Sequence, residues 1–320
     1  MTTIINLQDI KSLIPSIDVV QVIEEGFVQY SKGKAVVPPV AELLFDNPPG
    51  DVHIKYGYIK DQDYYCIKIA SGFYKNTELG VSSSQGMMLL FNQKTGQSVA
   101  VLLDEGYLTD IRTAAAGGVA AKYFAPKNVT GIGIIGTGIQ ARLQLELLMN
   151  LYPDKPVWVW GRNEEHVQRF VRKIKTENAI NISNSPSALA KKSNLIVTTT
   201  PSETPLLHSD DIQPGTHITA VGSDTKNKQE LDSQLLKRAD LIIADSISQS
   251  KSRGEIYQAT RNNLIAGKKI IELGDAIQDR SLQRTGEHQI SITDLTGVAV
   301  QDIMIATAIY TNYAKSRIKC

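Results

Sequence analysis

The sequence predicts an α/β protein in two parts: a strand-rich α+β part made mainly from the first half of the chain, and a doubly wound parallel sheet in the second half. Up to about residue 105, one helical segment is followed mostly by strand-like runs with turn signals between them. From Val129 onward, short apolar runs alternate with amphipathic helical runs, which is typical of a parallel sheet covered by helices. A last amphipathic segment, 300–318, lies beyond this alternation, and we expect it to return to the first part.

The first part begins with a helix predicted over 17–33, for which Ser16 is the expected N-cap and Gly33 the stop signal. Strands are predicted where apolar residues run between clusters of Gly, Pro, Asn and Asp. They cover 51–59, 64–71, 87–91 and 98–103, and the run NQKTGQ joins the last two as a hairpin.

A helix rich in small residues is predicted over 110–125, with Thr109 as its N-cap and Pro126 as its end. The alanines and glycines indicate that another backbone packs closely against it. Arg112 falls in the expected first turn, where a cation opposes the helix dipole. The positive end of the dipole and the guanidinium together predict an anion site at this corner.

The second part contains the alternating strands and helices. Strands are predicted over 129–136, 157–161, 180–183, 195–200, 217–223, 241–245 and 269–274, and helices over 139–152, 163–175, 187–193 and 231–239. The domain boundaries follow from this pattern: residues 1–125 and 299–320 form a substrate and dimerisation domain, and residues 126–298 form a nucleotide-binding domain.

The strongest local signal is the G-x-G-x-x-A form of the dinucleotide-binding fingerprint. It is spelled by Gly136, Thr137, Gly138, Ile139, Gln140 and Ala141. The run follows an apolar strand and opens a helix, which is the context that the motif requires. Gly136 permits the tight turn, Gly138 lets the backbone approach a pyrophosphate, and Ala141 keeps the helix close to the strand. The run therefore predicts a Rossmann domain that binds a nicotinamide cofactor, in preference to a plain glycine-rich turn.

The end of the second strand of this domain bears on the cofactor. NAD-specific folds usually place an acidic residue there, but this strand ends in Gly161-Arg162-Asn163. Arg162 could pair with a 2′-phosphate, so NADP(H) is favoured and NAD(H) stays open; the alternative is that Arg162 is a solvated loop residue. The ends of two later strands add further expected cofactor-binding residues, namely Thr199, Thr200, Gly222 and Ser223.

Three charged residues outside the fingerprint suggest a site for an amino or imino acid. Lys68 lies inside an apolar strand, where a lysine is costly unless it is paired or faces a cavity. Arg112 marks the anion site described above, and Asp224 follows a strand at the carboxyl edge of the parallel sheet, where open α/β folds bind ligands. The structural alternatives are a lysine at a surface edge, an arginine in a structural ion pair and an aspartate that caps a loop.

Four segments together resemble the ornithine cyclodeaminase/μ-crystallin family, in order and over essentially the whole chain. They are LLDEGYLTDIRTAAAGGVAAKYFAP, GIIGTGIQAR, VGSDTKNKQELD and DLTGVAVQD. The resemblance implies a Rossmann domain, a second domain that binds substrate and forms a homodimer, and a small amino- or imino-acid substrate. It also implies that Lys68 and Arg112 bind the substrate carboxylate and that Asp224 handles the amine or transfers a proton; Lys68 and Asp224 are the expected catalytic residues.

One departure from the family pattern concerns the substrate side chain. The family usually carries an arginine shortly after a proline in the first strand, and the matching position here is Ala41. Lys55, where many members have an apolar residue, is the expected replacement cation. At this lysine the chain resembles an iminosuccinate reductase branch, and it also resembles ectoine-utilisation cyclodeaminase-like proteins.

Three functions fit these observations. The leading interpretation is an NAD(P)H-dependent reductase of 2-imino acids, either iminosuccinate or small cyclic ketimines such as Δ1-pyrroline-2-carboxylate, that yields L-amino acids. The first alternative is an ornithine cyclodeaminase, an ammonia-lyase that forms proline with no net redox change. The second is a non-enzymatic binder of NADP and a small ligand, like the crystallin branch, which the retained lysine, arginine and aspartate disfavour.

The composition disfavours several other classes. Lysine plus arginine number 34 and aspartate plus glutamate 33, so no basic surface for nucleic acid or an anionic membrane is expected. No apolar run reaches the roughly 18 residues of a membrane span, and the N-terminus does not resemble a signal peptide. Cys66 and Cys320 form no disulfide framework, and the five histidines are scattered. We therefore expect a reduced, cytoplasmic protein without a metal site.

Overall fold

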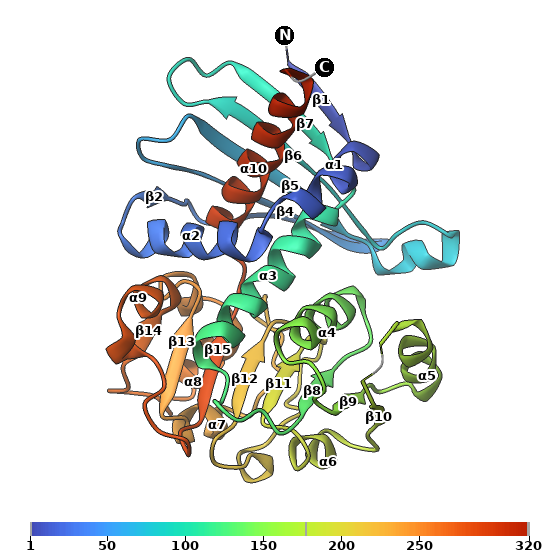
Figure 1. Ribbon diagram of the computed structural model, residues 1–320, viewed down its shortest axis with the longest axis vertical. Helices are drawn as coiled ribbons and strands as arrows, with labels where there is room; N and C mark the ends of the chain where they lie inside the picture. The colour runs from blue at the N-terminus through green and yellow to red at the C-terminus, as the bar shows by residue number, and fades with distance from the viewer. Residues whose placement is uncertain (1, 177, 319–320) are drawn as a thin grey trace. The chain divides into compact units, whose positions relative to one another are not determined.

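The structure is a computed structural model that describes residues 2–176 and 178–318. The chain divides into two compact units, one made of Met1–Thr113 with Val298–Cys320 and the other of Ala114–Gly297. The first unit holds a mainly antiparallel sheet and the second a parallel sheet flanked by helices (Figure 1). The predicted α/β class is therefore confirmed.

The second unit is built on an eight-stranded sheet whose neighbouring strands are parallel and follow the order β10-β9-β8-β11-β12-β15-β13-β14. The strands are β8 (Ile132–Ile135), β9 (Val157–Trp160), β10 (Ile180–Ile182), β11 (Leu195–Thr198), β12 (His217–Ala220), β13 (Leu241–Ala244), β14 (Ile270–Glu272) and β15 (Ser291–Asp294). The helices are α4 (Ile139–Leu151), α5 (Glu164–Lys173), α6 (Pro186–Ala190), α7 (Ser233–Arg238), α8 (Gly254–Arg261) and α9 (Leu273–Gln278).

The order of strands in this sheet reverses between β8 and β11. The chain runs outward from β8 to β9 and β10, then returns to place β11 and β12 on the other side of β8. Such a reversal leaves a crevice outside the carboxyl ends of the two strands, which is where open α/β sheets bind their ligands. Every residue of β8, β11 and β12 is buried, which explains why the sequence is almost entirely apolar in β8 and β11.

Three elements of this unit, β15, α8 and α9, were not predicted from the sequence. β15 lies between β12 and β13, but its sequence Ser-Ile-Thr-Asp is not an apolar run. Two of its polar side chains find partners inside the protein: Ser291 Oγ lies 2.9 Å from Nδ1 of the buried His217, and Oδ2 of Asp294 accepts a hydrogen bond from the N–H of Ile256. α8 was also missed, because its buried face includes Glu255 and Gln258 and so lacks a clear apolar stripe.

The first unit is a seven-stranded sheet in the order β1-β7-β6-β5-β4-β2, with β3 paired to β4. The strands are β1 (Thr3–Asn6), β2 (Ala35–Val36), β3 (Ala41–Asp46), β4 (Pro49–Ile59), β5 (Tyr64–Gly72), β6 (Ser84–Asn92) and β7 (Ser98–Leu103). The helices are α1 (Leu7–Leu13), α2 (Val19–Ser31), α10 (Ala299–Ile318) and the beginning of α3 (Tyr107–Phe124). α10 lies on β4, β5 and β6 and beside α2, so the end of the chain returns to the N-terminal part (Figure 1).

The two faces of this sheet differ in exposure. Alternate residues on one face, such as Ile5, Met88 and Leu102, are fully buried. The opposite face is also apolar but open: one row across the strands joins Ile4, Val101, Leu89, Ile67 and Tyr56, and Ile4 is 65% exposed. An apolar sheet face of this kind usually marks an interaction surface.

Two expected helix starts were wrong. Asp18, not Ser16, caps α2, because its carboxylate accepts a hydrogen bond from the backbone N–H of Gln21 while Ser16 ends a short 3₁₀ turn. α3 begins at Tyr107, so Thr109 lies inside the helix, and the carboxylate of Asp104 accepts from the N–H of Leu108. Strand β1 and helix α1 were not predicted.

The boundary between the units falls inside α3, at Thr113, and not after residue 125 as the sequence suggested. The second half of this helix packs within the parallel-sheet unit. A Cβ at Gly117 would lie 2.0 Å from the side chain of Gln144, and one at Gly118 would lie 2.6 Å from that of Leu147. The small residues of α3 therefore make room for side chains of α4. The sequence had instead predicted that the backbone of another element packs closely against this helix.

Three smaller observations complete the fold. Cys66 is a buried free thiol, and burial raises its pKa; Cys320 lies outside the described residues. Among the helices described, none has the length and apolar character to cross a membrane. In the described part of the chain, no three His, Cys, Asp or Glu side chains are arranged so that they could hold a metal ion together.

Candidate active site

The turn between β8 and α4 has the geometry of a dinucleotide cradle. Gly136 has φ +123°, a backbone conformation that favours glycine, and a Cβ there would lie 2.4 Å from Oγ1 of Thr199. Gly138 is the N-cap of α4, and Ala141 is fully buried beneath the first turn. The glycine at 136 is therefore required by the turn and by the neighbouring strand, as the fingerprint predicts.

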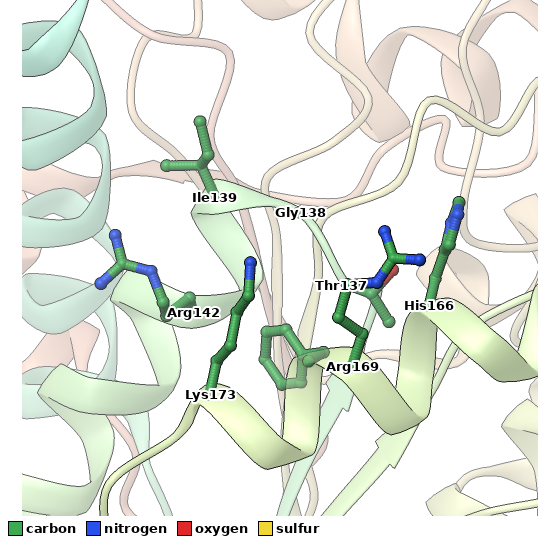
Figure 2. A pocket seen from close by; sticks show the side chains of 8 residues that line it. Thr137, Gly138, Ile139, Arg142, His166, Arg169 and Lys173 are labelled. Atoms are coloured by element: carbon green, nitrogen blue, oxygen red, sulfur yellow. The ribbon is translucent and has the colours of Figure 1, made fainter. Parts of the chain in front are cut away.

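Gly138 meets a different requirement. Its φ of −84° suits any residue, and a Cβ there would have no described neighbour within 4 Å. Packing and backbone strain thus do not explain this glycine, whereas close approach by a ligand does. The first N–H groups of α4 begin here, with no side-chain cap, which suits a pyrophosphate (Figure 2). These residues fit the phosphates of a dinucleotide.

A buried carboxylate joins the loops that follow β11 and β12. Glu230 accepts hydrogen bonds from Oγ1 of Thr198 at 2.7 Å, from the N–H and Oγ1 of Thr200, and from the N–H of Gly222 at 2.9 Å. Gly222 must be glycine, because a Cβ there would lie 2.2 Å from the carbonyl oxygen of Thr200. One side chain therefore fixes the relative position of two loops that carry expected cofactor-binding residues.

Glu230 is the first of four buried carboxylates. Its own N–H donates to Glu255 at 2.7 Å, Glu255 lies close enough to Asp294 for the two charges to interact, and Asp294 interacts similarly with Asp245. Burial raises the pKa of Glu230 to about 7, that of Asp294 to about 8 and that of Glu255 well above its usual range. Neighbouring carboxylates out of water cannot all be ionised, so the cluster holds protons at neutral pH.

This cluster predicts a pH-dependent stability. An unfolded aspartate titrates near pH 4, so between roughly pH 4 and pH 8 folded Asp294 binds more protons than unfolded Asp294, and the free energy of unfolding falls as pH rises. Asp294→Asn mimics the protonated form. We expect its Tm to fall less than that of the wild type between pH 5 and pH 8, by at least about 3 °C in differential scanning fluorimetry. Exposed Asp210→Asn is the control; equal slopes in all three proteins would contradict this account.

The loop after β12 carries the other two residues predicted from this strand. Ser223 is buried, and its Oγ donates to the carbonyl of Lys228 at 2.8 Å. The carboxylate of Asp224 lies 2.7 Å from Nζ of the same lysine and is half-exposed. Asp224 is thus held by an ion pair within its own loop while one side of it stays accessible.

In the first unit, Lys68 and Arg112 meet at one buried carboxylate. Nζ of Lys68 lies 3.4 Å from Oδ2 of Asp302, and Nε of Arg112 lies 3.1 Å from Oδ1. The guanidinium of Arg112 also donates to Oε1 of Gln301. The three charged residues are 2%, 5% and 1% exposed. Two cations share the carboxylate of Asp302, so these three side chains carry an excess of one positive charge. The buried carboxyl of Asp104 also interacts with Lys68, but burial raises its pKa and so favours its neutral form.

That excess charge can be satisfied by an anionic ligand. Burial lowers the pKa of Lys68, and Asp302 opposes this shift. Lys68 is therefore neither at a surface edge nor unpaired. The reasoning from the helix dipole was wrong for Arg112, because α3 begins at Tyr107 and places Arg112 in its second turn. What makes this place a candidate anion site is that Lys68 and Arg112 share the carboxylate of Asp302.

Lys55 faces the same side of the sheet as Lys68. The two residues stand directly opposite each other in the β4–β5 register, so a second ammonium group belongs to this face. Ala41 pairs with Ile54 and lies on the other face. Lys55 is therefore not a positional replacement for a cation at 41, and its own place opposite Lys68 is what supports its role.

The carboxylates that organise both groups were not predicted from the sequence. Asp302 lies in DLTGVAVQD and Glu230 in VGSDTKNKQELD, two segments that carried the family resemblance, but neither residue had been assigned a role. For Asp302 the available signal was a charged side chain in a largely apolar stretch, as it was for Lys68, whereas Glu230 lies in a polar run and gave no such signal. The pairing itself could not be foreseen, because Lys68 and Asp302 are far apart in the chain.

Curated relatives match nearly the whole chain. An uncharacterised cyclodeaminase of Sinorhizobium fredii is 39% identical over 304 residues, which are 93% of this chain and 92% of the relative. The iminosuccinate reductase of Paracoccus denitrificans is 31% identical over 291 residues, 90% of this chain and 89% of the relative.

Solved structures with the same fold cover almost all of both chains. An archaeal alanine dehydrogenase, a dimer with bound NAD, has a TM-score of 0.89 and 32% identity, covering 99% of this chain and 97% of its own. A Δ1-pyrroline-2-carboxylate reductase of Thermococcus litoralis, in complex with NADH and L-proline, has a TM-score of 0.90 and 26% sequence identity, and the match covers 98% of each chain. The iminosuccinate reductase of Paracoccus denitrificans, in complex with NAD⁺, has a TM-score of 0.88 and 28% sequence identity. The match covers 99% of this chain and 98% of the reductase.

The family assignment rests on the full length of the chain. The model of the ornithine cyclodeaminase/mu-crystallin family matches residues 1–317, which include the Gly136 cradle, the Glu230 cluster and the Lys68–Asp302–Arg112 group. Relatives above 30% identity cover nine-tenths of it or more. This protein belongs to the ornithine cyclodeaminase/mu-crystallin family.

Proposed function

We propose that this protein is a nicotinamide-dependent reductase of 2-imino acids that forms L-amino acids. The observation that carries the proposal is the buried group in which Lys68 and Arg112 share Asp302, because its excess positive charge suits a carboxylate leaving water. The dinucleotide cradle at Gly136 to Ala141 supports the redox part. Relatives named as reductases of iminosuccinate and of Δ1-pyrroline-2-carboxylate support the substrate class.

The reaction divides the work between cofactor and protein. The bound nicotinamide supplies a hydride to the C=N carbon, and one proton reaches the nitrogen, so a 2-imino acid, NAD(P)H and a proton give an amino acid and NAD(P)⁺. In this proposal Lys68 and Arg112 hold the carboxylate next to the reacting carbon and so orient it. Asp224 handles the proton at the nitrogen, and the Asp224–Lys228 pair positions the carboxylate that does so.

The side chain of the substrate is where Lys55 matters. A second carboxylate needs a further cation, and Lys55 stands on the same sheet face opposite Lys68. We therefore favour iminosuccinate, a dicarboxylate, over monocarboxylate ketimines such as Δ1-pyrroline-2-carboxylate. Mixing oxaloacetate with ammonia generates the imine in solution. We expect NADH or NADPH oxidation with that mixture to exceed oxidation with pyruvate and ammonia; the reverse order would remove the support for a dicarboxylate.

A cyclodeaminase is the second candidate, because the relative at 39% identity is named as one. The two activities differ in a single optical measurement. A reductase consumes NAD(P)H in proportion to the imine added. A cyclodeaminase releases ammonia from L-ornithine with no net change at the nicotinamide absorption band.

For the cofactor we propose NADP(H), with NAD(H) as the alternative. Arg162 follows β9 with no acidic residue beside it and is exposed, so a 2′-phosphate could reach it. The solved neighbours contain NAD or NADH, which supports the alternative. Further positive residues close to this strand end, described below, are the reason for favouring the phosphorylated form.

We also propose a homodimer formed through the open apolar face of the first unit's sheet. Its exposed Ile4, Tyr56 and Met87 would be covered in a two-fold pair, and the archaeal neighbour is a dimer. We expect twice the chain mass in light scattering at micromolar concentration. Met87→Glu should shift the protein toward the monomer, whereas Lys94→Glu in the exposed hairpin should not. A wild-type monomer would overturn the proposal.

A further inference from the structure

A positively charged cleft lies beside the dinucleotide cradle in the second unit. It has a volume of about 330 Å³ and is enclosed by the start of α4 and one side of α5. Its lining residues are Thr137, Gly138, Ile139, Arg142, His166, Arg169, Phe170 and Lys173. Four of these eight side chains are basic and none is acidic, although the whole protein carries a net charge of only +1.

Most of these basic side chains have no partner in the part of the chain that is described. Arg142 pairs with Glu146 at 2.9 Å within α4. Neither a hydrogen bond nor an ion pair joins the side chain of His166, Arg169 or Lys173 to another described residue. Three unpartnered basic groups therefore gather on one helix face around a single cleft. A carboxylate from the protein would normally balance such a group, so the arrangement points to an anion from outside.

The side chains converge on the cradle. Figure 2 shows His166 and Arg169 rising side by side from α5 toward Thr137, with Lys173 pointing into the cleft from the next turn. Thr137 in turn touches the end of β9, because a Cβ at Gly161 would lie 2.8 Å from its methyl group. Arg162 is the next residue. His166 and Arg169 thus flank the meeting point of the cradle and the end of the second strand.

We propose that His166 and Arg169 bind the 2′-phosphate of NADP(H). This inference rests on the proposed nicotinamide-dependent function, because it assigns one end of the same cofactor. A phosphate monoester carries up to two negative charges and accepts hydrogen bonds on three oxygens, so several donors from different directions suit it. The guanidinium of Arg169 supplies a planar pair of donors, and the ring of His166 supplies one more.

The same cleft could in principle attract any phosphate. Its position decides between sources: in a dinucleotide fold the pyrophosphate lies at the N-terminus of the first helix, and the ribose hydroxyls of the adenosine lie at the end of the second strand. His166 and Arg169 border the second of these places. A 5′-phosphate held at the cradle would leave them unused, whereas a 2′-phosphate would engage them.

The experiment compares two ligands that differ only in the 2′-phosphate, 2′,5′-ADP and 5′-AMP, by isothermal titration calorimetry on the full chain. We expect 2′,5′-ADP to bind at least about tenfold more tightly than 5′-AMP. Arg169→Gln should remove most of that difference and leave 5′-AMP binding within about twofold. His166→Gln should reduce it by a smaller factor. Arg172→Gln, which removes an exposed cation from the same helix but outside the cleft, is the matched control.

The other outcomes are equally informative. If Arg169→Gln weakens both ligands equally, the residue adds only to the general positive field and the proposal is overturned. If wild-type protein binds both ligands equally, the cleft does not recognise a 2′-phosphate. NADH has no 2′-phosphate, so NADH-dependent turnover of an imine by the wild-type protein would separate failure of this inference from failure of the proposed function.

Discussion

Asp302→Asn is expected to lower kcat/KM for 2-imino acids by at least about 100-fold, or roughly 3 kcal/mol, and to destabilise the fold. The side chain keeps its shape, but the buried Lys68 and Arg112 lose the carboxylate that they share. Breaking a buried pair on one side costs about 3–5 kcal/mol, because the remaining charge stays out of water. Lys68 should then shed its proton, and the carboxylate of the substrate should lose one of its two cations.

A double variant separates the positioning role of Asp302 from a merely structural one. The charges of Lys68, Arg112 and Asp302 sum to +1 in the wild type. Asp302→Asn would raise this sum to +2, which is why Lys68 is expected to lose its proton. Lys68→Met combined with Asp302→Asn restores +1, so we expect its Tm to recover most of the loss. Activity should stay low, because Lys68, one of the two cations that hold the carboxylate of the substrate, is still missing. Recovery of both properties would show that the group serves the fold alone.

Lys55→Met is expected to impair reduction of iminosuccinate by about 2 kcal/mol, roughly 30-fold in kcat/KM. The reason is that a dicarboxylate needs a cation beyond the pair that holds its first carboxylate, and Lys55 stands opposite Lys68. A monocarboxylate ketimine should be spared or even improved. Lys60→Met, near the end of the same strand, is the control, because its ammonium instead donates to the carbonyl of Gly33.

The variant Asp224→Asn tests the residue that is proposed to handle the proton, and it complements the test of Lys55. A group that handles the proton acts on every substrate, so kcat should fall about 100-fold or more for mono- and dicarboxylates alike. Equal slowing of both classes by Lys55→Met would make the lysine a general anion clamp. If Lys55→Met slows neither class, the lysine has no role in substrate binding and iminosuccinate loses its main support.

Much of the fold could be predicted because local patterns determine it. Strands such as β8 and β11 are buried on both faces and therefore read as apolar runs, and the fingerprint placed the turn before α4 correctly. β15 could not be recognised in the same way. Its burial depends on partners distant in the chain, such as the pairing of Ser291 with His217, which make a polar sequence acceptable in the middle of a sheet.

The candidate site could be predicted one residue at a time but not as a group. Lys68 drew attention because a lysine in an apolar strand needs a reason, and the structure supplies it in Asp302, which lies on the last helix. Glu230 gave no comparable signal, since a glutamate before a helix is ordinary. The basic face of α5 was also overlooked, because histidine, arginine and lysine are common on exposed helices. Only the cleft beside the cradle distinguishes them.

The most direct test of imine reduction follows the hydride itself. NADH and NADPH labelled with deuterium at C4, each in both stereochemical forms, are incubated with the enzyme, oxaloacetate and ammonia, and the products are examined by mass spectrometry and NMR. The account predicts L-aspartate with one deuterium on C2 from one form only, and one oxidised cofactor for each product molecule. Ammonia release from a diamino acid, with no deuterium in the product and no net loss of reduced cofactor, would contradict it.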